Sequence, residues 1–209
     1  MHADLLLVRH GQSEGNESGR FGGHGPTPLT KLGQRQAKGL VKLADEGPIH
    51  AIYASDLLRA QETATPLAER LGLPIQSLPG LRERSVGLMT GLTFPEAEVR
   101  FPTEYAAMMR RDPGARPPEG ETQAECAARA VPVLESLAAQ HPGQRIVVVS
   151  HAMTLSLLLY HVVGADLSHL PRLFFRTDNC AIHRLRYTLP NIWTIYATND
   201  QRHLSGMEP

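Results

Sequence analysis

Two arginines and two histidines follow apolar runs that are typical of buried strands. They are Arg9, His10, Arg59 and His151. The carboxyl ends of parallel strands meet at one edge of an open sheet, where ligands bind, so we expect these side chains to converge there. Cationic groups that share a partly dry pocket repel one another unless an anion joins them. Because guanidinium groups bind phosphate oxygens bidentately, the pattern indicates a phosphoryl site.

Backbone groups beside these side chains could take part in the same site. Gly11 follows His10 directly, and its missing side chain would let the main chain approach a phosphate closely. Helices that begin near Arg59 and His151 would direct the N–H groups of their first turns at the anion. We therefore expect side-chain and backbone donors together around the phosphoryl group.

The chemistry that these residues favour is phosphoryl transfer through histidine. A histidine nucleophile divides a difficult displacement into two steps, and His10 is the candidate. Fixed arginines and histidines could stabilise charge on the equatorial oxygens without a metal. The leaving alkoxide needs a proton, and Glu83 could supply it if a partly desolvated pocket keeps it protonated. Taken alone, a glutamate between Arg82 and Arg84 is more typical of a surface ion pair.

Strands and helices alternate along the chain, which predicts βαβ crossovers and a three-layer α/β/α fold with a mainly parallel sheet. Strands are predicted over residues 4–8, 50–55 and 145–150, and helices over 30–47, 56–72, 120–143 and 153–164. Two later segments, 179–187 and 193–199, alternate in hydropathy and predict antiparallel strands at a sheet edge.

Residues 87–119 interrupt this alternation. The segment contains several glycines and prolines, and we expect short helices and loops inserted over one end of the sheet, where they shape substrate access. No internal repeat or linker divides the chain. We therefore expect one domain over residues 1–209 with a cap-like insertion.

The overall composition is that of a folded, water-soluble protein. The 21 basic and 21 acidic residues balance, so no broad field attracts nucleic acid or an anionic membrane. Cys126 and Cys180 form neither a disulfide framework nor a zinc motif, and no apolar run is long enough for a signal peptide or a membrane span. We expect a cytoplasmic protein that captures its anion locally.

Six blocks of the sequence resemble the histidine phosphatase superfamily, which includes the cofactor-dependent phosphoglycerate mutases. In chain order they are RHGQSEGN, PLTKLGQRQA, YASDLLRAQETA, LRERSVG, GET and VVSHA. The resemblance spans about residues 4–155. It departs from the family at GGHGPTPLT, which lacks the usual acidic residue, so His24 receives no catalytic role, and at Val86 and Met89, where aromatic residues are frequent.

The resemblance implies roles for the matching residues. His10 would be the transiently phosphorylated nucleophile, and Glu83 would protonate the leaving group and then help to activate water. The phosphoryl group would be held by Arg9, Arg59, His151, Asn16 and the backbone at Ala152. The expected partner is a small phosphorylated molecule, and no cofactor is expected.

Phosphatases and mutases of this superfamily differ in the fate of the phosphohistidine, since a mutase must exclude water. Arg110 and Arg111 resemble an arginine pair that holds the substrate carboxylate in phosphoglycerate mutases, although ordinary surface charge is the alternative. The stretches RPPEGET and ATNDQRHL resemble the phosphatase branch. We therefore favour a metal-independent phosphomonoester hydrolase over a phosphoglycerate mutase.

Two other classes of protein compete with this interpretation. A zinc hydrolase would explain the 10 histidines, but no HExxH motif is present and the neighbouring arginines would repel a cation. A noncatalytic phosphate-binding module would not need both His10 and Glu83. Many metabolites present the same phosphoryl end, so the sequence leaves the substrate open, and it leaves the oligomeric state open as well.

Overall fold

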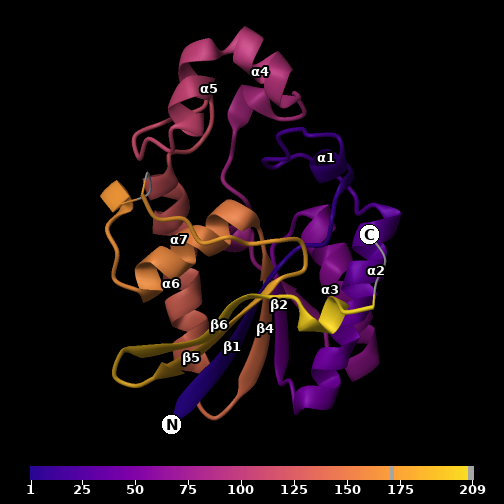
Figure 1. Cartoon of the computed structure of the whole chain (residues 1–209). Coiled ribbons are helices and arrows are strands. Elements are labelled where there is room, and N and C mark those ends of the chain that lie inside the picture. Colours follow the sequence, from indigo (N-terminus) through magenta and orange to yellow (C-terminus); the bar gives the residue numbers. More distant parts are fainter. Residues whose placement is uncertain (170–171, 207–209) are drawn as a thin grey trace.

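The computed structural model describes residues 1–169 and 172–206, in which six strands form one mixed sheet (Figure 1). The strands are β1 (His2–Arg9), β2 (Ala51–Ala54), β3 (Ile75–Ser77), β4 (Arg145–Ser150), β5 (Ile182–Thr188) and β6 (Ile192–Asp200). Their order across the sheet is β3-β2-β4-β1-β5-β6. The first four run parallel, β5 lies antiparallel to β1, and β6 lies antiparallel to β5. The predicted mainly parallel sheet with an antiparallel edge is confirmed.

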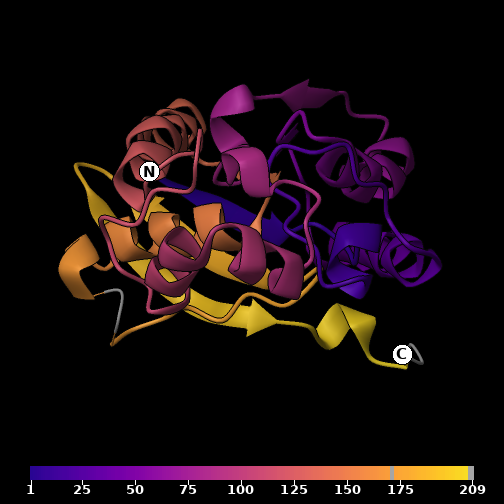
Figure 2. The same ribbon diagram turned by 90° about the horizontal axis from the view of Figure 1, so that it is seen from above.

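Helices cover both faces of this sheet (Figure 2). The α-helices are α1 (Glu14–Glu17), α2 (Lys31–Gly39), α3 (Leu58–Leu71), α4 (Phe94–Arg100), α5 (Pro102–Met109), α6 (Gln123–Gln140) and α7 (Ala152–Val162). The 3₁₀ helices are η1 (Leu40–Glu46), η2 (Pro79–Leu81), η3 (Gly87–Met89), η4 (Leu167–His169) and η5 (Arg202–Leu204). Helices α6 and α7 pack on one face, and α3 and η1 pack on the other. The three-layer α/β/α fold is therefore confirmed.

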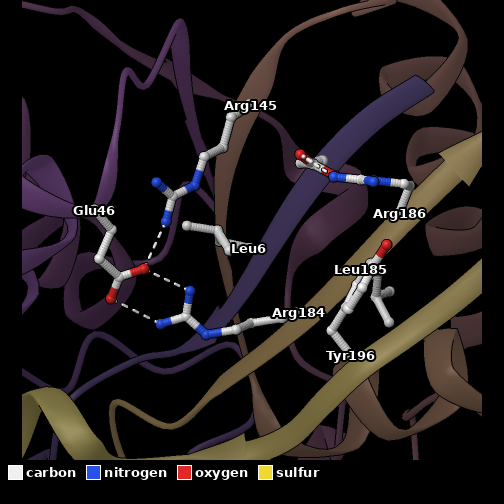
Figure 3. Close-up of a pocket in the computed structure, with 8 residues that line it drawn as sticks. Leu6, Glu46, Arg145, Arg184, Leu185, Arg186 and Tyr196 are labelled. Atoms are coloured by element: carbon white, nitrogen blue, oxygen red, sulfur yellow. Dashed lines mark hydrogen bonds and ion pairs between the residues drawn. The ribbon is translucent and has the colours of Figure 1, made fainter. Parts of the chain in front are cut away.

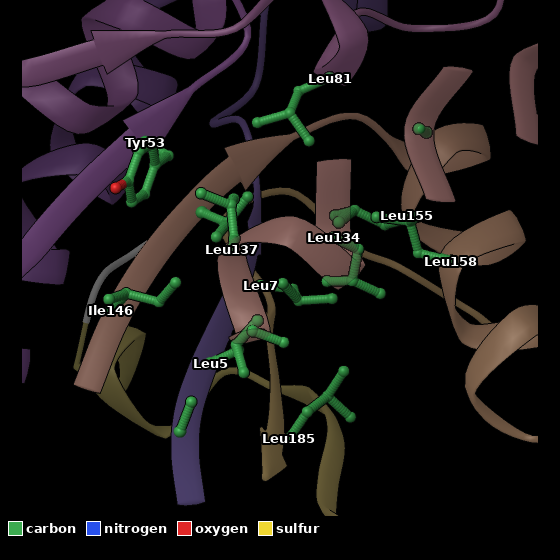
Figure 4. Packing of buried hydrophobic residues seen from close by; sticks show 14 of the residues in the cluster. Leu5, Leu7, Tyr53, Leu81, Leu134, Leu137, Ile146, Leu155, Leu158 and Leu185 are labelled. Atoms are coloured by element: carbon green, nitrogen blue, oxygen red, sulfur yellow. The ribbon is translucent and has the colours of Figure 1, made fainter. Parts of the chain in front are cut away.

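Strand β4 shows why its sequence is apolar throughout. Ile146 and Val148 point into the cluster that α6 and α7 cover, whereas Val147 and Val149 point into the cluster under α3. All four side chains are fully buried, as expected for a parallel strand with helices on both faces. Figure 4 shows the first of these clusters around Leu134, with α6 side chains packed against β1 and β4.

Two elements differ from the expectation. The helix predicted over 30–47 ends as an α-helix at Gly39 and continues as the 3₁₀ helix η1, in which Leu40 and Leu43 are fully buried. Strand β3 was not predicted, since three residues are too few to show a strand period. Among the described residues, no helix combines the length and the hydropathy that crossing a membrane requires.

The segment 87–119 contains η3, α4 and α5, which lie above the carboxyl ends of the parallel strands (Figure 1). Thr93 caps α4 in a reciprocal arrangement with Glu96. A small cluster built on Val86, Met89 and Ala97 holds the segment together. This part of the chain thus has apolar packing of its own and stands over the edge where the predicted site residues end their strands.

Candidate active site

His10 and His151 meet where β1 and β4 end. Their ring centroids are 5.1 Å apart, with the ring planes inclined by 55°. His10 is 4% exposed and His151 is fully buried. The backbone N–H of His10 donates to the Ser150 carbonyl at 3.0 Å, which continues the β1–β4 pairing up to the site. Parallel pairing therefore brings together two histidines that are 141 positions apart in sequence.

The surroundings of His10 leave it neutral with one nitrogen free. Its Nδ1 lies 2.7 Å from the Gly11 carbonyl, which can only accept, so Nδ1 carries the proton and Nε2 carries the lone pair. Burial lowers the pKa of His10 well below its usual value, and the charges of Arg59 and Arg9 lower it further. The Nε2 atom is thus available as a nucleophile without prior deprotonation.

Arg9 and Arg59 bring positive charge to the histidines without carboxylate partners. Arg59 is 2% exposed and donates to the carbonyls of Gly23 at 2.7 Å and Gly25 at 3.1 Å. Arg9 donates to the Thr177 carbonyl at 2.6 Å. Within the described residues no carboxylate pairs with either guanidinium, and burial lowers the pKa of both.

Several buried polar atoms at this site have no hydrogen-bond partner among the described residues. They are Arg9 Nε, His151 Nδ1 and His151 Nε2. A buried polar atom without a partner costs free energy, on the order of 1–3 kcal/mol. An oxyanion among these groups would accept hydrogen bonds from Arg9 Nε and from the protonated nitrogen of His151, and it would offset the two guanidinium charges.

Glu83 lies at the N-terminus of α7, beside this cluster. Its carboxylate accepts hydrogen bonds from the backbone N–H groups of Arg84 at 2.9 Å and of Met153 and Thr154 at 3.2 Å each. These three backbone donors fix the position of the carboxyl group at the start of the helix. The surface ion pair with Arg82 or Arg84 is wrong, because Arg82 pairs with Asp56 and Arg84 donates to carbonyl oxygens.

Arg129 holds the loop that carries Glu83, and sequence reasoning missed it. Its guanidinium donates to the carbonyls of Gly80, Arg82 and Glu83 at 2.8–3.0 Å, and it pairs bidentately with Glu121. An arginine on the apolar side of a helix, next to the buried Ala130, was the signal in the sequence. His24, which we gave no catalytic role, donates from Nε2 to the Glu83 carbonyl at 2.7 Å.

Backbone contacts to the phosphoryl group were predicted at Gly11 and Ala152, and the structure gives the two N–H groups different surroundings. The Gly11 N–H donates to Thr63, and a Cβ atom there would lie 2.7 Å from the Gly33 carbonyl, so close packing requires a glycine at this position. Ala152 begins α7, and the next two N–H groups of that helix go to Glu83. The Ala152 N–H is therefore a donor in the first turn of α7 that does not bond to the Glu83 carboxylate.

Asn16 is exposed within α1, the short helix that follows Gly11. Its Oδ1 accepts from Asn179 Nδ2 at 3.0 Å, and the same Nδ2 donates to the His10 carbonyl at 3.1 Å. Asn179 thereby links the loop after β1 to the strand end that carries the nucleophile candidate. Sequence reasoning did not single it out, because 163 positions separate Asn179 from Asn16.

Comparison with known proteins agrees with this geometry. A sequence profile described as the histidine phosphatase superfamily (branch 1) matches residues 5–201. The chain belongs to this superfamily. It is 34% identical over 204 residues to a "Probable phosphoglycerate mutase GpmB" of Yersinia enterocolitica, covering 96% of this chain and 94% of that one.

Solved histidine phosphatase structures resemble this one as well. The mycobacterial glucosyl-3-phosphoglycerate phosphatase, solved with VO3, has a TM-score of 0.83 and 28% identity, covering 94% of this chain and 98% of that chain. Bacillus stearothermophilus YhfR has a TM-score of 0.89 and 25% identity, covering 97% and 99%. The named relatives therefore include both a phosphatase and proteins designated mutases.

The space beside Glu83 in this member of the histidine phosphatase superfamily is a cavity of about 360 Å³. Apolar side chains dominate its lining, together with Arg20 and Arg84. Arg110 and Arg111 do not line it: Arg110 ends α5, and the Arg111 guanidinium stacks over the Phe174 ring at 4.3 Å. The predicted arginine pair for a substrate carboxylate is therefore outside the cavity.

Proposed function

We propose that this histidine phosphatase is a metal-independent phosphomonoester hydrolase that acts on a small phosphorylated metabolite through phosphohistidine at His10. The observation that carries the proposal is the neutral His10 imidazole, whose free Nε2 lies among buried cationic and unpartnered donors. Those groups match what an incoming phosphoryl group requires: a nucleophile and stabilisation of its oxygens.

In the first step, His10 Nε2 forms a bond to phosphorus while the ester P–O bond breaks. Arg9, Arg59 and His151 hold the phosphoryl oxygens, with Asn16 and the Ala152 N–H as further donors. The leaving alkoxide takes a proton from Glu83. Glu83 therefore enters this step with its proton and leaves it as a carboxylate.

In the second step, water attacks phosphorus and the Nε2–P bond breaks. The Glu83 carboxylate, formed when the alcohol departed, now accepts a proton from that water. Inorganic phosphate leaves, and His10 returns to its neutral state. The same carboxyl group thus acts as acid and then as base, and each cycle consumes one ester and one water.

The phosphoglycerate mutase is the second candidate, and the resemblance to GpmB favours it. Two features support the phosphatase instead. Arg110 and Arg111 lie outside the cavity beside Glu83, and Arg20 in its lining already donates to the Gly91 carbonyl and to Glu96. The proposal includes a single domain over residues 1–209, on which residues 87–119 form a cap over the active site. Residues 170–171 and 207–209 of this domain lie outside the described structure.

A panel of phosphomonoesters, assayed with a chelator present, tests the proposal. Phosphate release should far exceed the interconversion of 2- and 3-phosphoglycerate. His10→Ala should lower kcat/KM at least about a thousandfold, or about 4 kcal/mol of barrier. If the wild-type protein interconverts the phosphoglycerates faster than it releases phosphate, the mutase is favoured. If it is inactive on the whole panel, a noncatalytic phosphate-binding module is favoured.

A further inference from the structure

The cavity beside Glu83 has one part close to the reacting groups and one part far from them. Glu83, Ala152 and Gly23 lie in its lining, and Gly23 accepts a hydrogen bond from Arg59. A phosphoryl group held by Arg59 would therefore point its ester oxygen at Glu83 and the rest of the molecule into the cavity. The lining of the far part then decides which leaving groups bind.

That far part is built from large apolar side chains. Three phenylalanines and three methionines contribute to it: Phe21, Phe94, Phe174, Met108, Met109 and Met153. The inserted segment supplies three of them, and the loop before β5 supplies Phe174. Aromatic faces bind planar apolar groups well, and methionine adapts to different shapes.

Some of these side chains are exposed in the absence of a ligand. Phe94 is 45% exposed, Met109 is 51% exposed and Phe174 is 40% exposed, and all three line the same cavity. An apolar ligand would remove this surface from water, which is favourable in proportion to the area covered.

The phenylalanine rings that line the cavity are held in place by their neighbours. Phe21 meets Phe94 edge to face with centroids 4.9 Å apart, and Arg111 stacks on Phe174. Because the walls are ordered before binding, little conformational entropy is lost when a ligand enters.

The polar groups of the cavity are largely committed elsewhere. Arg20 donates to Gly91 and Glu96, and Arg84 donates to the carbonyls of Ala115 and Glu121. A leaving group with several hydroxyls would lose its bonds to water and find few partners here, which is costly. An apolar leaving group carries no such cost.

We propose that the preferred substrates are phosphomonoesters whose leaving group carries an aromatic or similarly apolar body, bound between Phe94 and Phe174. This inference rests on the proposed phosphatase function and adds its substrate class. Arg111 then acts on specificity indirectly, because it orients the Phe174 ring.

The test compares two primary alkyl esters, 3-phenylpropyl phosphate and glycerol 3-phosphate, so that the leaving alkoxides are of one kind and the bodies differ in polarity. The wild-type kcat/KM should be at least about tenfold higher for the phenylpropyl ester, which corresponds to about 1.4 kcal/mol. Phe94→Ala and Phe174→Ala should each remove most of that ratio. Val99→Ala, on the same helix as Phe94 but 85% exposed and outside the cavity lining, should leave it unchanged.

The ratio does not depend on how much of a variant is folded. Equal kcat/KM for both esters in the wild type would overturn the apolar leaving-group pocket while the phosphatase stands. Equal losses for both esters in the phenylalanine variants would also overturn it. Failure to release phosphate from the phenylpropyl ester, by a protein that hydrolyses other members of the phosphomonoester panel, would also overturn the inference. Only inactivity on the whole panel would overturn the phosphatase itself.

Discussion

At the scale of single residues, the protonation state of His10 decides whether the site can react. Burial and the nearby guanidinium groups of Arg59 and Arg9 all disfavour a charged imidazole, and they lower its pKa well below the usual value. His151 is shifted in the same direction by burial and by Arg59. Both rings therefore stay neutral at neutral pH in the ligand-free protein.

The neutral state of both imidazoles can be tested by an NMR titration of the histidine rings. Without ligand, His10 and His151 should take up a proton only well below pH 6.5, and Arg59→Met should move the His10 midpoint upward because one repelling charge is gone. Nitrogen-15 ring shifts, assigned with His10→Asn and His151→Asn, measure this. A wild-type midpoint at or above 6.5 for His10 would contradict the neutral nucleophile.

At the scale of elements, the loop between η2 and η3 depends on α6 for its position. Arg129 supplies this support through bonds to three loop carbonyls and to Glu121. Since the donors sit on a packed helix, the loop holds Glu83 against the N-terminus of α7. Misplacing a catalytic group by about 1 Å can cost two orders of magnitude in rate.

We therefore expect Arg129→Met to act as a positioning variant. It should lower kcat/KM about tenfold or more for alkyl esters, whose alkoxides need a proton from Glu83, and much less for p-nitrophenyl phosphate, whose leaving group departs without one. Arg116→Met, which removes an exposed ion pair with Glu125 at the start of α6, is the matched control. Equal losses on both substrates would show that Arg129 only stabilises the fold.

At the scale of the whole molecule, the arginines on the described strands pair with carboxylates, with the exception of Arg9 at the candidate active site. A second cavity, of about 380 Å³, lies toward the amino ends of β1 and β4 (Figure 3). Its arginines pair with carboxylates: Arg145 and Arg184 with Glu46, and Arg186 with Asp4. Each arginine of this cavity therefore has a carboxylate partner, unlike Arg9 and Arg59, and the two pairs with Glu46 join η1 to the sheet.

Asp200, at the end of β6, extends this network and gives a prediction for stability. Hydrogen bonds from Arg202 and Arg184 hold the pKa of Asp200 below its usual value, although burial alone raises it. A lowered folded pKa means that the stabilisation is present above about pH 4, the unfolded value, and is lost as pH falls below it.

Asp200→Asn should therefore lower the free energy of unfolding at pH 7 by about 1–2 kcal/mol, and the difference should shrink toward pH 2. Urea denaturation at several pH values measures it. Asp45→Asn, at an exposed position on η1, is the control that should change little. A deficit that stays constant down to pH 2 would show that Asp200 does not act through its charge.

The amino-acid sequence alone was enough to predict the superfamily, the order of most strands and helices, and the bounds of β4. An apolar run such as residues 145–150 is a local signal, because the hydropathy period involves only neighbouring residues. The order of the motifs placed His10 and His151 at one sheet edge for the same reason: each follows its own strand directly.

Only the tertiary structure decided what surrounds those residues. The partners of Glu83 lie on α7, about 70 positions away, the space that Gly11 leaves is filled by Gly33, and Arg111 turns to Phe174 rather than into the cavity. These contacts arise from the packing of distant segments, and neither hydropathy period nor motif spacing encodes which side chain will meet which. The charge state and the apolar lining of the site therefore became visible only in three dimensions.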